Sequence, residues 1–289
     1  LAKMDGGVVV DMDTARIRSA NVQLLPNASI QTSETGMRHR TAERVARQTG
    51  YPVISVSQSM RIISLYVDGK RHVLEPSESI LASANQALSA LERYKARLDQ
   101  TSAGLDSLEI EDLVTVRDVT SVLQLMEMVR RISADIDSYV LELGTDGRLL
   151  ALQVEELTRG LLAEHGFLLE DYLPEGLDTT TVDARLKWVG SPALLDLAMV
   201  ARSMGLGGID GQDLDAQVSP RGLRILSKIP RLPVVTARAV VEQWGSLQGV
   251  LGATIEELEA VEGVGAQRAR TLRDGLSRLA EISVVERYS

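Results

Sequence analysis

Short apolar runs separated by polar turns mark the first hundred residues, and this pattern predicts a mixed α/β region. The runs at residues 7–10, 53–57, 62–67 and 71–74 have the length and the β-branched composition of strands. Asp68 and Gly69 separate the last two runs, so these runs are expected to pair as a hairpin. Residues 41–48 instead have helical composition, and Gly50 follows them as a residue that commonly ends a helix.

From residue 77 onward the apolar positions recur at helical spacing. A long helix is expected over residues 79–98, and residues 106–172 continue as helix, with a turn at 144–147 before an amphipathic stretch over 149–162. Segments this rich in Leu, Val and Met typically pack as a bundle or spine of helices with a solvated charged face. Proline and glycine interrupt residues 173–215, where one short helix is expected over 193–204.

The negative charge of the chain is concentrated in its middle. The net charge of −9 divides into +3 over residues 1–101, −14 over 102–215 and +2 over 216–289. We interpret the acidic surface of the spine as solvated rather than as a partner-binding surface. Contacts with a polyanion, if the chain makes any, are expected at its two ends.

Composition excludes several classes of protein. The 44% hydrophobic and 25% charged content suits a globular chain. The absence of cysteine excludes disulfides and favours a reducing, cytoplasmic setting, and His39, His72 and His165 are too scattered for a zinc site. No apolar run is long enough for a membrane span, and no charged segment followed by an apolar stretch marks a signal peptide. The sequence starts at Leu1 rather than Met, so we expect residues upstream of it.

The C-terminal region carries a glycine hairpin followed by an arginine-rich helix. Gly263, Val264 and Gly265 form the hairpin, and Arg268 and Arg270 lie on the helix after it. The N–H groups at the start of that helix, with its positive dipole end, can cradle a phosphate. This resembles the helix-hairpin-helix motif, which grips the DNA backbone without reading bases. The alternative is a simple tight turn between two helices.

A second copy of this pattern lies 32 residues upstream. Residues 229–233 align with 261–265, and residues 236–238 align with 268–270. Pro233 replaces the second hairpin glycine and removes one N–H group, so this copy is expected to pair with the other copy more than it binds phosphate. The tandem arrangement favours DNA binding over a plain turn.

The N-terminal region holds two candidate nucleotide motifs. Arg38, His39, Arg40 and Thr41 stand at an expected helix start, where planar guanidinium groups and helix N–H groups could hold a triphosphate. The alternative is a solvated, salt-bridged surface. Upstream, Asp5 precedes the glycine pair at positions 6 and 7, which gives a carboxylate beside backbone that a nucleotide can approach, or else an ordinary turn.

The two N-terminal motifs together resemble the diadenylate cyclase family, whose marks are Asp-Gly-Ala on a strand and Arg-His-Arg further along the chain. Here they stand as Asp5-Gly6-Gly7, with Gly7 where the family has Ala, and as Arg38-His39-Arg40 within the string RHRTAER. A cyclase domain followed by a helical spine and a helix-hairpin-helix domain is the architecture of the DNA integrity scanning branch of this family. The resemblance thus implies an α/β cyclase domain over residues 1–101, an all-α spine over 102–215 and an all-α tandem helix-hairpin-helix domain over 216–289, with part of the first domain upstream.

The resemblance also implies an activity. The chain would condense two ATP into cyclic di-AMP with release of two pyrophosphates, and its C-terminal domain would recognise branched or damaged DNA. Asp5 would bind Mg²⁺ or Mn²⁺ and help to activate the 3′-hydroxyl. The nucleotide-binding residues that the family implies are Gly6, Leu24, Arg38, His39, Arg40, Thr41 and Ser57.

The chain carries one Asp-Gly-Gly motif and one Arg-His-Arg motif, so it supplies one half of a site for two nucleotides. Two chains must therefore meet, and the family implies an octamer with cyclase domains face to face. The alternative of another class is a non-enzymatic, oligomeric DNA-binding protein. A nuclease has less support, because Asp5, Asp11 and Asp13 show no recognised metal-site spacing.

Overall fold

The computed structural model describes residues 6–57, 62–208 and 211–287, with side chains described up to residue 281. The chain forms two compact units, one of residues 1–85 and 139–147 and one of residues 86–138 and 148–289. The domain boundary expected at residue 101 falls inside a continuous helix, α2 (Ser77–Glu111), and the expected boundaries stay predictions.

The strands of the first unit form two antiparallel sheets. β1 (Gly7–Asp11) pairs with β2 (Arg16–Val22), and β4 (Ile62–Val67) lies between β3 (Val53–Ser57) and β5 (Lys70–Leu74). The hairpin expected around Asp68 and Gly69 is confirmed, and their φ values of 50° and 71° are those of the turn that suits a two-residue hairpin. β2 was not expected, because its sequence RIRSANV is mostly polar and its side chains are mostly exposed.

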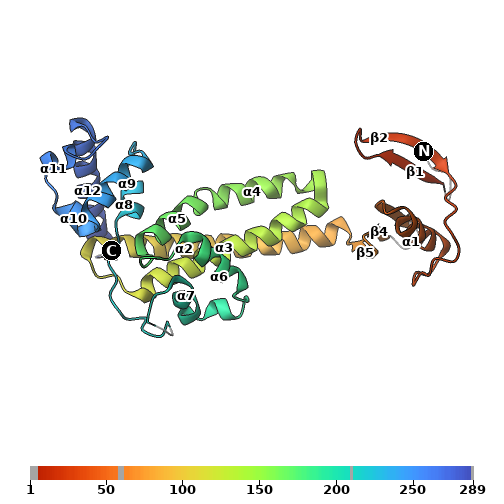
Figure 1. Ribbon diagram of the computed structural model, residues 1–289, viewed down its shortest axis with the longest axis horizontal. Coiled ribbons are helices and arrows are strands. Elements are labelled where there is room, and N and C mark those ends of the chain that lie inside the picture. Colours follow the sequence, from red (N-terminus) through yellow and green to blue (C-terminus); the bar gives the residue numbers. More distant parts are fainter. Residues whose placement is uncertain (1–5, 58–61, 209–210, 288–289) are drawn as a thin grey trace. The chain divides into compact units, whose positions relative to one another are not determined.

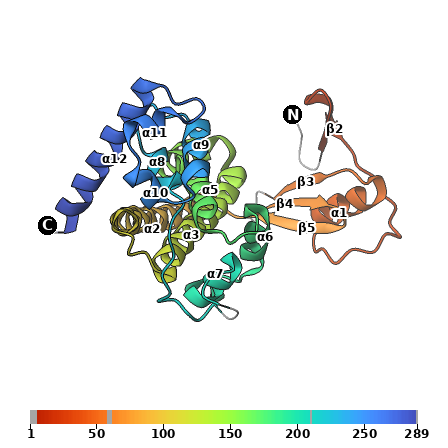
Figure 2. The ribbon, with the colours of Figure 1, turned by 60° about the vertical axis from the view of Figure 1, so that its left-hand side comes forward.

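Helix α1 (Met37–Thr49) packs on one face of the sheet formed by β3, β4 and β5 (Figure 2). Ala42 and Ala46 of the helix pack with Tyr66 of β4 in a small apolar core. The helix ends as expected at Gly50, which has a φ of 71° and donates its N–H to the carbonyl of Ala46. It begins four residues before the expected start at residue 41, so the whole Arg-His-Arg motif lies in its first turn.

The sheet also buries polar side chains beneath α1. Ser55 and Ser57 of β3 are buried, whereas Ile54, the residue before Ser55, is 66% exposed. The pleat of a strand sends alternate side chains to opposite faces, so Ile54 and Val56 lie on the face away from α1. Val53 shares the face of Ser55 and Ser57 and packs against the small apolar core. The interior next to the Arg-His-Arg motif is therefore lined by hydroxyl groups.

The middle of the chain is helical, as expected (Figure 1). α2 is followed by α3 (Val116–Leu143), the short 3₁₀ helix η1 (Gly144–Gly147), α4 (Arg148–Thr158) and α5 (Leu161–Tyr172). The stretch expected over 149–162 is two helices, because Gly160 has a left-handed φ of 82° and separates α4 from α5. No helix among the residues described here is long and apolar enough to cross a membrane.

The region of residues 173–215 holds more helix than expected. η2 (Ala193–Leu195) and α7 (Leu197–Met204) together correspond to the helix expected over 193–204. α6 (Thr179–Trp188) was not expected, because three consecutive threonines have low helix propensity. Asp178 compensates at its start, where the carboxylate accepts the N–H of Thr181.

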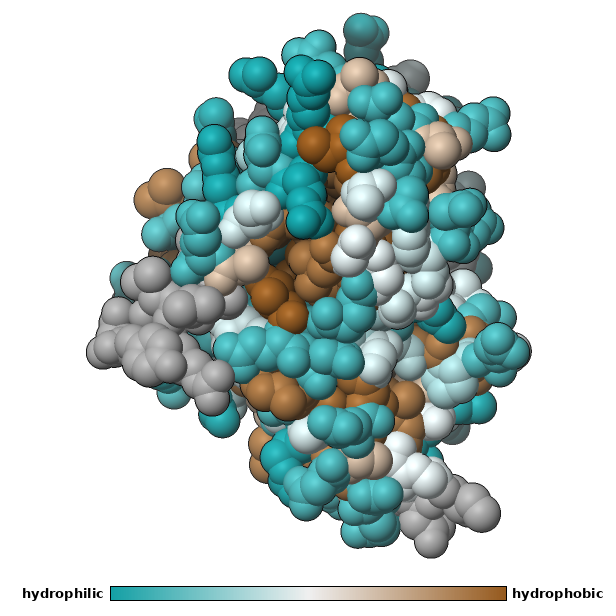
Figure 3. Space-filling model, turned by 90° about the vertical axis from the view of Figure 1, so that its left-hand side faces the viewer, coloured by the Kyte–Doolittle hydropathy of each residue, from teal (hydrophilic) through white to brown (hydrophobic). Residues whose placement is uncertain are grey.

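The C-terminal region has five helices among the described residues: α8 (Leu223–Ser227), α9 (Val234–Trp244), α10 (Leu247–Gly252), α11 (Ile255–Glu259) and α12 (Ala266–Arg287). They enclose one apolar core, which includes Leu226, Val240, Leu258 and Leu272. Hydrophilic side chains cover most of this end of the molecule, with apolar side chains visible between them (Figure 3). The predicted fold class, α/β followed by two all-α regions, is confirmed.

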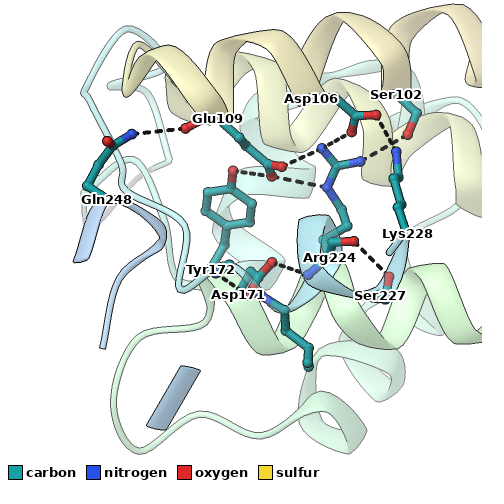
Figure 4. A network of polar contacts seen from close by, with 11 residues as sticks. Ser102, Asp106, Glu109, Asp171, Tyr172, Arg224, Ser227, Lys228 and Gln248 are labelled. Atoms are coloured by element: carbon teal, nitrogen blue, oxygen red, sulfur yellow. Dashed lines mark hydrogen bonds and ion pairs between the residues drawn. The ribbon is translucent and has the colours of Figure 1, made fainter. Parts of the chain in front are cut away.

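A buried ion-pair network fastens α8 to helix α2 (Figure 4). Arg224 is 2% exposed, and its guanidinium lies 2.6 Å from carboxylate oxygens of both Glu109 and Asp106. Tyr172 donates its hydroxyl to Glu109 at 2.6 Å. Burial raises the pKa of Glu109, and the charge and hydrogen bonds of Arg224 oppose that shift. The pairing lets α2 and α8 bury these charged groups together.

Helix α5 is fastened to the start of α8 by Asp171. Its carboxylate accepts the backbone N–H groups of Gly222, Leu223 and Arg224 at 3.0, 2.7 and 2.8 Å. These donors have no partner within a helix that starts here, so Asp171 satisfies the first turn of α8 from outside. Burial raises the pKa of Asp171 to about 7. The spine and the C-terminal helices thus share polar anchors as well as one compact unit.

Candidate nucleotide site and DNA-binding surface

The two arginines of the Arg-His-Arg motif are exposed at the first turn of α1. Arg38 donates from Nη1 to the carbonyl of Val56 at 3.2 Å, and Arg40 donates from Nε to the carbonyl of Glu34 at 3.0 Å. Arg40 forms no ion pair with a carboxylate in the described part of the chain. Backbone carbonyls thus help to position both guanidinium groups.

The acidic side chains beside α1 are paired with other cations. Glu43 lies 2.6 Å from Arg47, and Glu34 lies 3.1 Å from Arg71. Glu43 also accepts the hydroxyl of Thr32. In a salt-bridged surface these two carboxylates would neutralise Arg40, but each is paired with another arginine. The local geometry therefore favours an external anion as the partner of Arg40.

His39 lies beneath the helix and is only 2% exposed. Its Nδ1 is hydrogen-bonded to the hydroxyl of Tyr66 at 3.1 Å, while its Nε2 is buried and has no hydrogen-bond partner among the described residues. Burial, together with the negative charge of Glu34, raises the pKa of Tyr66 to about 12, so this hydroxyl keeps its proton at neutral pH. A buried imidazole nitrogen without a partner is costly unless a ligand or water satisfies it.

Hydroxyl groups surround this part of α1. Ser55 Oγ is buried without a partner among the described residues, and Ser57 is buried at the end of β3. Arg38 reaches the carbonyl of Val56, the residue before Ser57, so the structure brings Arg38 and Ser57 to the same end of β3. Thr41 is half-buried one turn into α1.

The remaining predicted nucleotide-binding residues lie on the β1–β2 hairpin and the segment after it. A Cβ atom on Gly6 would come within 2.5 Å of Asn21 Oδ1, and one on Gly7 would come within 3.2 Å of Leu24 Cδ1. The structure thus brings Gly6, Gly7 and Leu24 together around a close backbone approach. Their joining with the Arg-His-Arg group in one pocket stays a prediction.

Asp5, the predicted metal ligand, lies outside the described residues. No group of three or more His, Asp or Glu side chains that could hold a metal comes together in the part of the chain that is described. A cation here would depend on Asp5 and on oxygens of the nucleotide, which is how Mg²⁺ is commonly held in nucleotide sites.

The glycine hairpin near the C-terminus has the expected form. Gly263 adopts a left-handed φ of 82°, Val264 is buried, and Gly265 leads directly into α12. Arg268 donates to the carbonyl of Gly263 at 2.7 Å and closes the hairpin. Arg270 is exposed and has no hydrogen-bond or ion-pair partner among the described residues, so it can contact a phosphate.

The upstream copy repeats the hairpin with other residue types. Arg231 has a left-handed φ of 65° where the second copy has Gly263, and Leu232 is buried like Val264. Arg238 corresponds to Arg270, but its guanidinium is paired with Glu170 of α5.

Comparison with known proteins covers almost the whole chain. Residues 1–71 match the family described as DisA bacterial checkpoint controller nucleotide-binding, residues 74–212 match the DisA bacterial checkpoint controller linker region, and residues 223–278 match the SAM-like helix-hairpin-helix tandem. The chain is 57% identical to the DNA integrity scanning protein DisA of Acidothermus cellulolyticus. The alignment covers all of this chain and 79% of that protein. It is 55% identical to the same protein of Streptomyces coelicolor, covering 78% of it, and 54% identical to that of Kineococcus radiotolerans, covering 81%.

The chain belongs to the DisA family. It has the nucleotide-binding diadenylate cyclase domain of that family, its linker and its helix-hairpin-helix DNA-binding domain. The recognition made from Asp5-Gly6-Gly7, Arg38-His39-Arg40 and the glycine hairpin is confirmed at this level.

Two partners of the candidate site residues could not be predicted from the sequence. Tyr66, the partner of His39, is separated from it by 27 residues, and strand alternation indicates only that Tyr66 is buried. Glu170, the partner of Arg238, lies in a segment interpreted as solvated spine. In both cases the partner is set by packing between elements, which a linear pattern does not reveal.

Proposed function

We propose that Arg38, His39, Arg40, Thr41 and Ser57 hold the phosphates of ATP, and that Gly6 and Leu24 line the nucleoside pocket. Two observations carry this proposal. The buried His39 Nε2 has no partner among the described residues, and the guanidinium of Arg40, the next residue of α1, forms no ion pair with a carboxylate there. An oxygen of a bound nucleotide would satisfy the imidazole and would neutralise the cation. Tyr66 fixes the ring orientation through Nδ1.

The proposed reaction makes two phosphodiester bonds. The 3′-oxygen of each ATP attacks the α-phosphorus of the other, the bond from that phosphorus to the bridging oxygen breaks, and pyrophosphate leaves while the hydroxyl proton is lost. The cations at the start of α1 stabilise charge on the phosphoryl oxygens, and holding both nucleotides head to tail supplies the orientation. The products are one cyclic di-AMP and two pyrophosphates.

Asp5 is proposed as the ligand of the Mg²⁺ or Mn²⁺ ion. Such an ion would supply charge stabilisation at the phosphates and would assist ionisation of the 3′-hydroxyl. The cyclisation needs two half-sites, so we also propose a homo-oligomer, an octamer with face-to-face cyclase domains, working in the cytoplasm.

The second proposed site is the DNA-binding surface at the hairpin of Gly263, Val264 and Gly265. Its backbone N–H groups and the exposed Arg268 and Arg270 suit phosphate groups, and no base-reading helix is evident in the described part of the chain. Branched or damaged DNA is the proposed partner, recognised by shape.

The test is product analysis with ATP and Mg²⁺ or Mn²⁺, without DNA. Chromatography should show cyclic di-AMP and pyrophosphate, and Asp5→Asn should abolish both while the melting temperature and oligomeric state stay unchanged. Full turnover by Asp5→Asn would contradict the role of Asp5. Release of phosphate or AMP without any cyclic di-AMP from the unaltered chain would contradict the cyclase assignment.

A further inference from the structure

Helix α5 of the spine holds an arginine of the DNA-binding region. Arg238 donates from Nε and Nη2 to the two carboxylate oxygens of Glu170, at 2.9 and 2.7 Å. This is a bidentate arrangement, the same arrangement with which a guanidinium grips a phosphate. The carboxylate therefore occupies the donor groups that Arg238 would otherwise present to DNA.

The internal repeat places Arg238 where a DNA contact is expected. It is the fifth residue of α9, and Arg270 is the fifth residue of α12. The alanine before each arginine, Ala237 and Ala269, is fully buried, so the two helices sit in the core in the same orientation. Both arginines consequently project to the outside at equivalent positions after their hairpins.

The first hairpin also needs a side chain to bind phosphate. Pro233 stands where the second copy has Gly265, so the backbone N–H that would face the phosphate is absent there. A cation on the following helix can replace that donor. Arg238 is the exposed arginine of α9 in the described structure.

The pair between Arg238 and Glu170 is exposed enough to exchange. The arginine side chain is 52% exposed and that of Glu170 is 36% exposed. Ion pairs of this exposure contribute little to stability. The neighbouring anchors are independent of it: Arg221 donates to the backbone carbonyl of Glu170, and the adjacent Asp171 caps α8. Release of the Glu170 carboxylate would leave the joint between α5 and α8 intact.

We infer that Arg238 is a second DNA-phosphate contact, and that DNA binding exchanges the Glu170 carboxylate for a phosphate. The inference rests on the proposed DNA-binding function of the C-terminal helices. Since Glu170 belongs to the linker and Arg238 to the helix-hairpin-helix region, the exchange also removes one linker contact each time DNA binds.

The experiment measures the affinity of the full chain for a fluorescently labelled four-way DNA junction across a range of salt concentrations. Arg238→Ala should weaken binding and flatten the slope of log affinity against log salt by about one phosphate contact. Arg238→Lys should restore most of that slope, because a point charge still neutralises a phosphate. Glu170→Gln should strengthen binding by up to about five-fold, the size of an exposed ion pair.

Glu242→Gln is the matched control. Glu242 lies on α9 and lines the same surface hollow as Arg238 and Glu170, and it is unpaired among the described residues. Glu242→Gln removes the same negative charge as Glu170→Gln. An equal gain in DNA affinity would show that the gain comes from net charge alone, and this result would overturn the inference. The double variant Glu170→Gln/Arg238→Ala should bind like Arg238→Ala, and a persisting gain would likewise overturn it.

Arg270→Ala separates this inference from the function on which it rests. Loss of affinity in Arg270→Ala with no change in Arg238→Ala would overturn the role of Arg238 alone. No change in either variant would contradict the proposed DNA surface as a whole. Equal melting temperatures of all variants should accompany these measurements, because none removes a buried group.

Discussion

Arg231 and Gly263 occupy the same left-handed backbone conformation at equivalent positions of the two hairpins, with φ values of 65° and 82°. This conformation costs an L-amino acid about 1 kcal/mol or more, whereas glycine adopts it freely. The first copy therefore tolerates strain at Arg231 that the second copy avoids. The buried Leu232 and Val264 that follow hold each hairpin in the core.

Gly263→Ala should destabilise the protein by about 1 kcal/mol, because alanine is strained at this φ. No atom lies within 4 Å of the added methyl group, so steric clash adds nothing. Gly265→Ala is the control: the methyl group there also meets open space, and its φ is not in the left-handed region. Chemical denaturation should separate the two variants, and equal destabilisation would contradict this account of the hairpin.

Tyr66→Phe should lower cyclic di-AMP synthesis by about five-fold, since loss of one neutral hydrogen bond corresponds to about 1 kcal/mol. The hydroxyl positions His39 and does not touch the nucleotide in our proposal. An unchanged rate would show that Tyr66 has only a packing role.

The network around Arg224 predicts a large difference between buried and exposed ion pairs. Arg224→Ala leaves the fully buried Glu109 without its cation and should cost about 3–5 kcal/mol in the free energy of unfolding. Arg117→Ala removes an exposed pair with Asp215 and should cost less than about 1 kcal/mol. Urea denaturation measures both. Comparable losses would contradict the burial of the network.

Glu127 makes stability depend on pH. Burial alone would raise the pKa of Glu127, but hydrogen bonds and charges from Arg130 and Arg131 outweigh burial and lower it. A carboxyl whose pKa is lower in the folded state stabilises the protein above its ordinary pKa of 4.5, and that contribution is lost as the pH falls through the folded value. Glu127→Gln should therefore cost about 2 kcal/mol at pH 7.

The difference in unfolding free energy between Glu127→Gln and the unaltered chain should narrow as the pH falls below 4.5. Glu156→Gln is the control, because Glu156 and its partner Arg159 are both exposed. The unfolding free energy of Glu156→Gln should stay close to that of the unaltered chain at every pH. If the difference in unfolding free energy between Glu127→Gln and the unaltered chain did not change with pH, the charge of Glu127 would not be involved.

Much of the fold could be predicted from local signals. Gly50 ends α1, and the turn at Asp68 and Gly69 joins β4 to β5, because each position needs a backbone conformation that few residues adopt. β2 and α6 escaped prediction, since one is a mostly exposed polar strand and the other starts with three threonines. Their stability comes from pairing and capping rather than from an apolar pattern.

The site was predictable in its chemistry but not in its contacts. The arginines at positions 38 and 40 could be assigned to phosphate from residue type and helix position alone. The burial of His39 against Tyr66 and the pairing of Arg238 with Glu170 depend on how α1 packs on its sheet and how α5 packs on α9. Such distant pairs leave no periodic signal in one sequence.

The most direct test of the central claim is the rate of cyclic di-AMP formation by Arg40→Ala compared with Arg47→Ala. Both arginines lie on α1, but Arg47 is paired with Glu43, whereas Arg40 donates only to a backbone carbonyl in the described structure. If Arg40 stabilises phosphoryl charge, its loss should reduce the rate by about a hundred-fold or more, and Arg47→Ala should stay close to the unaltered chain. Equal rates for the two variants would contradict the assignment of this helix start to ATP.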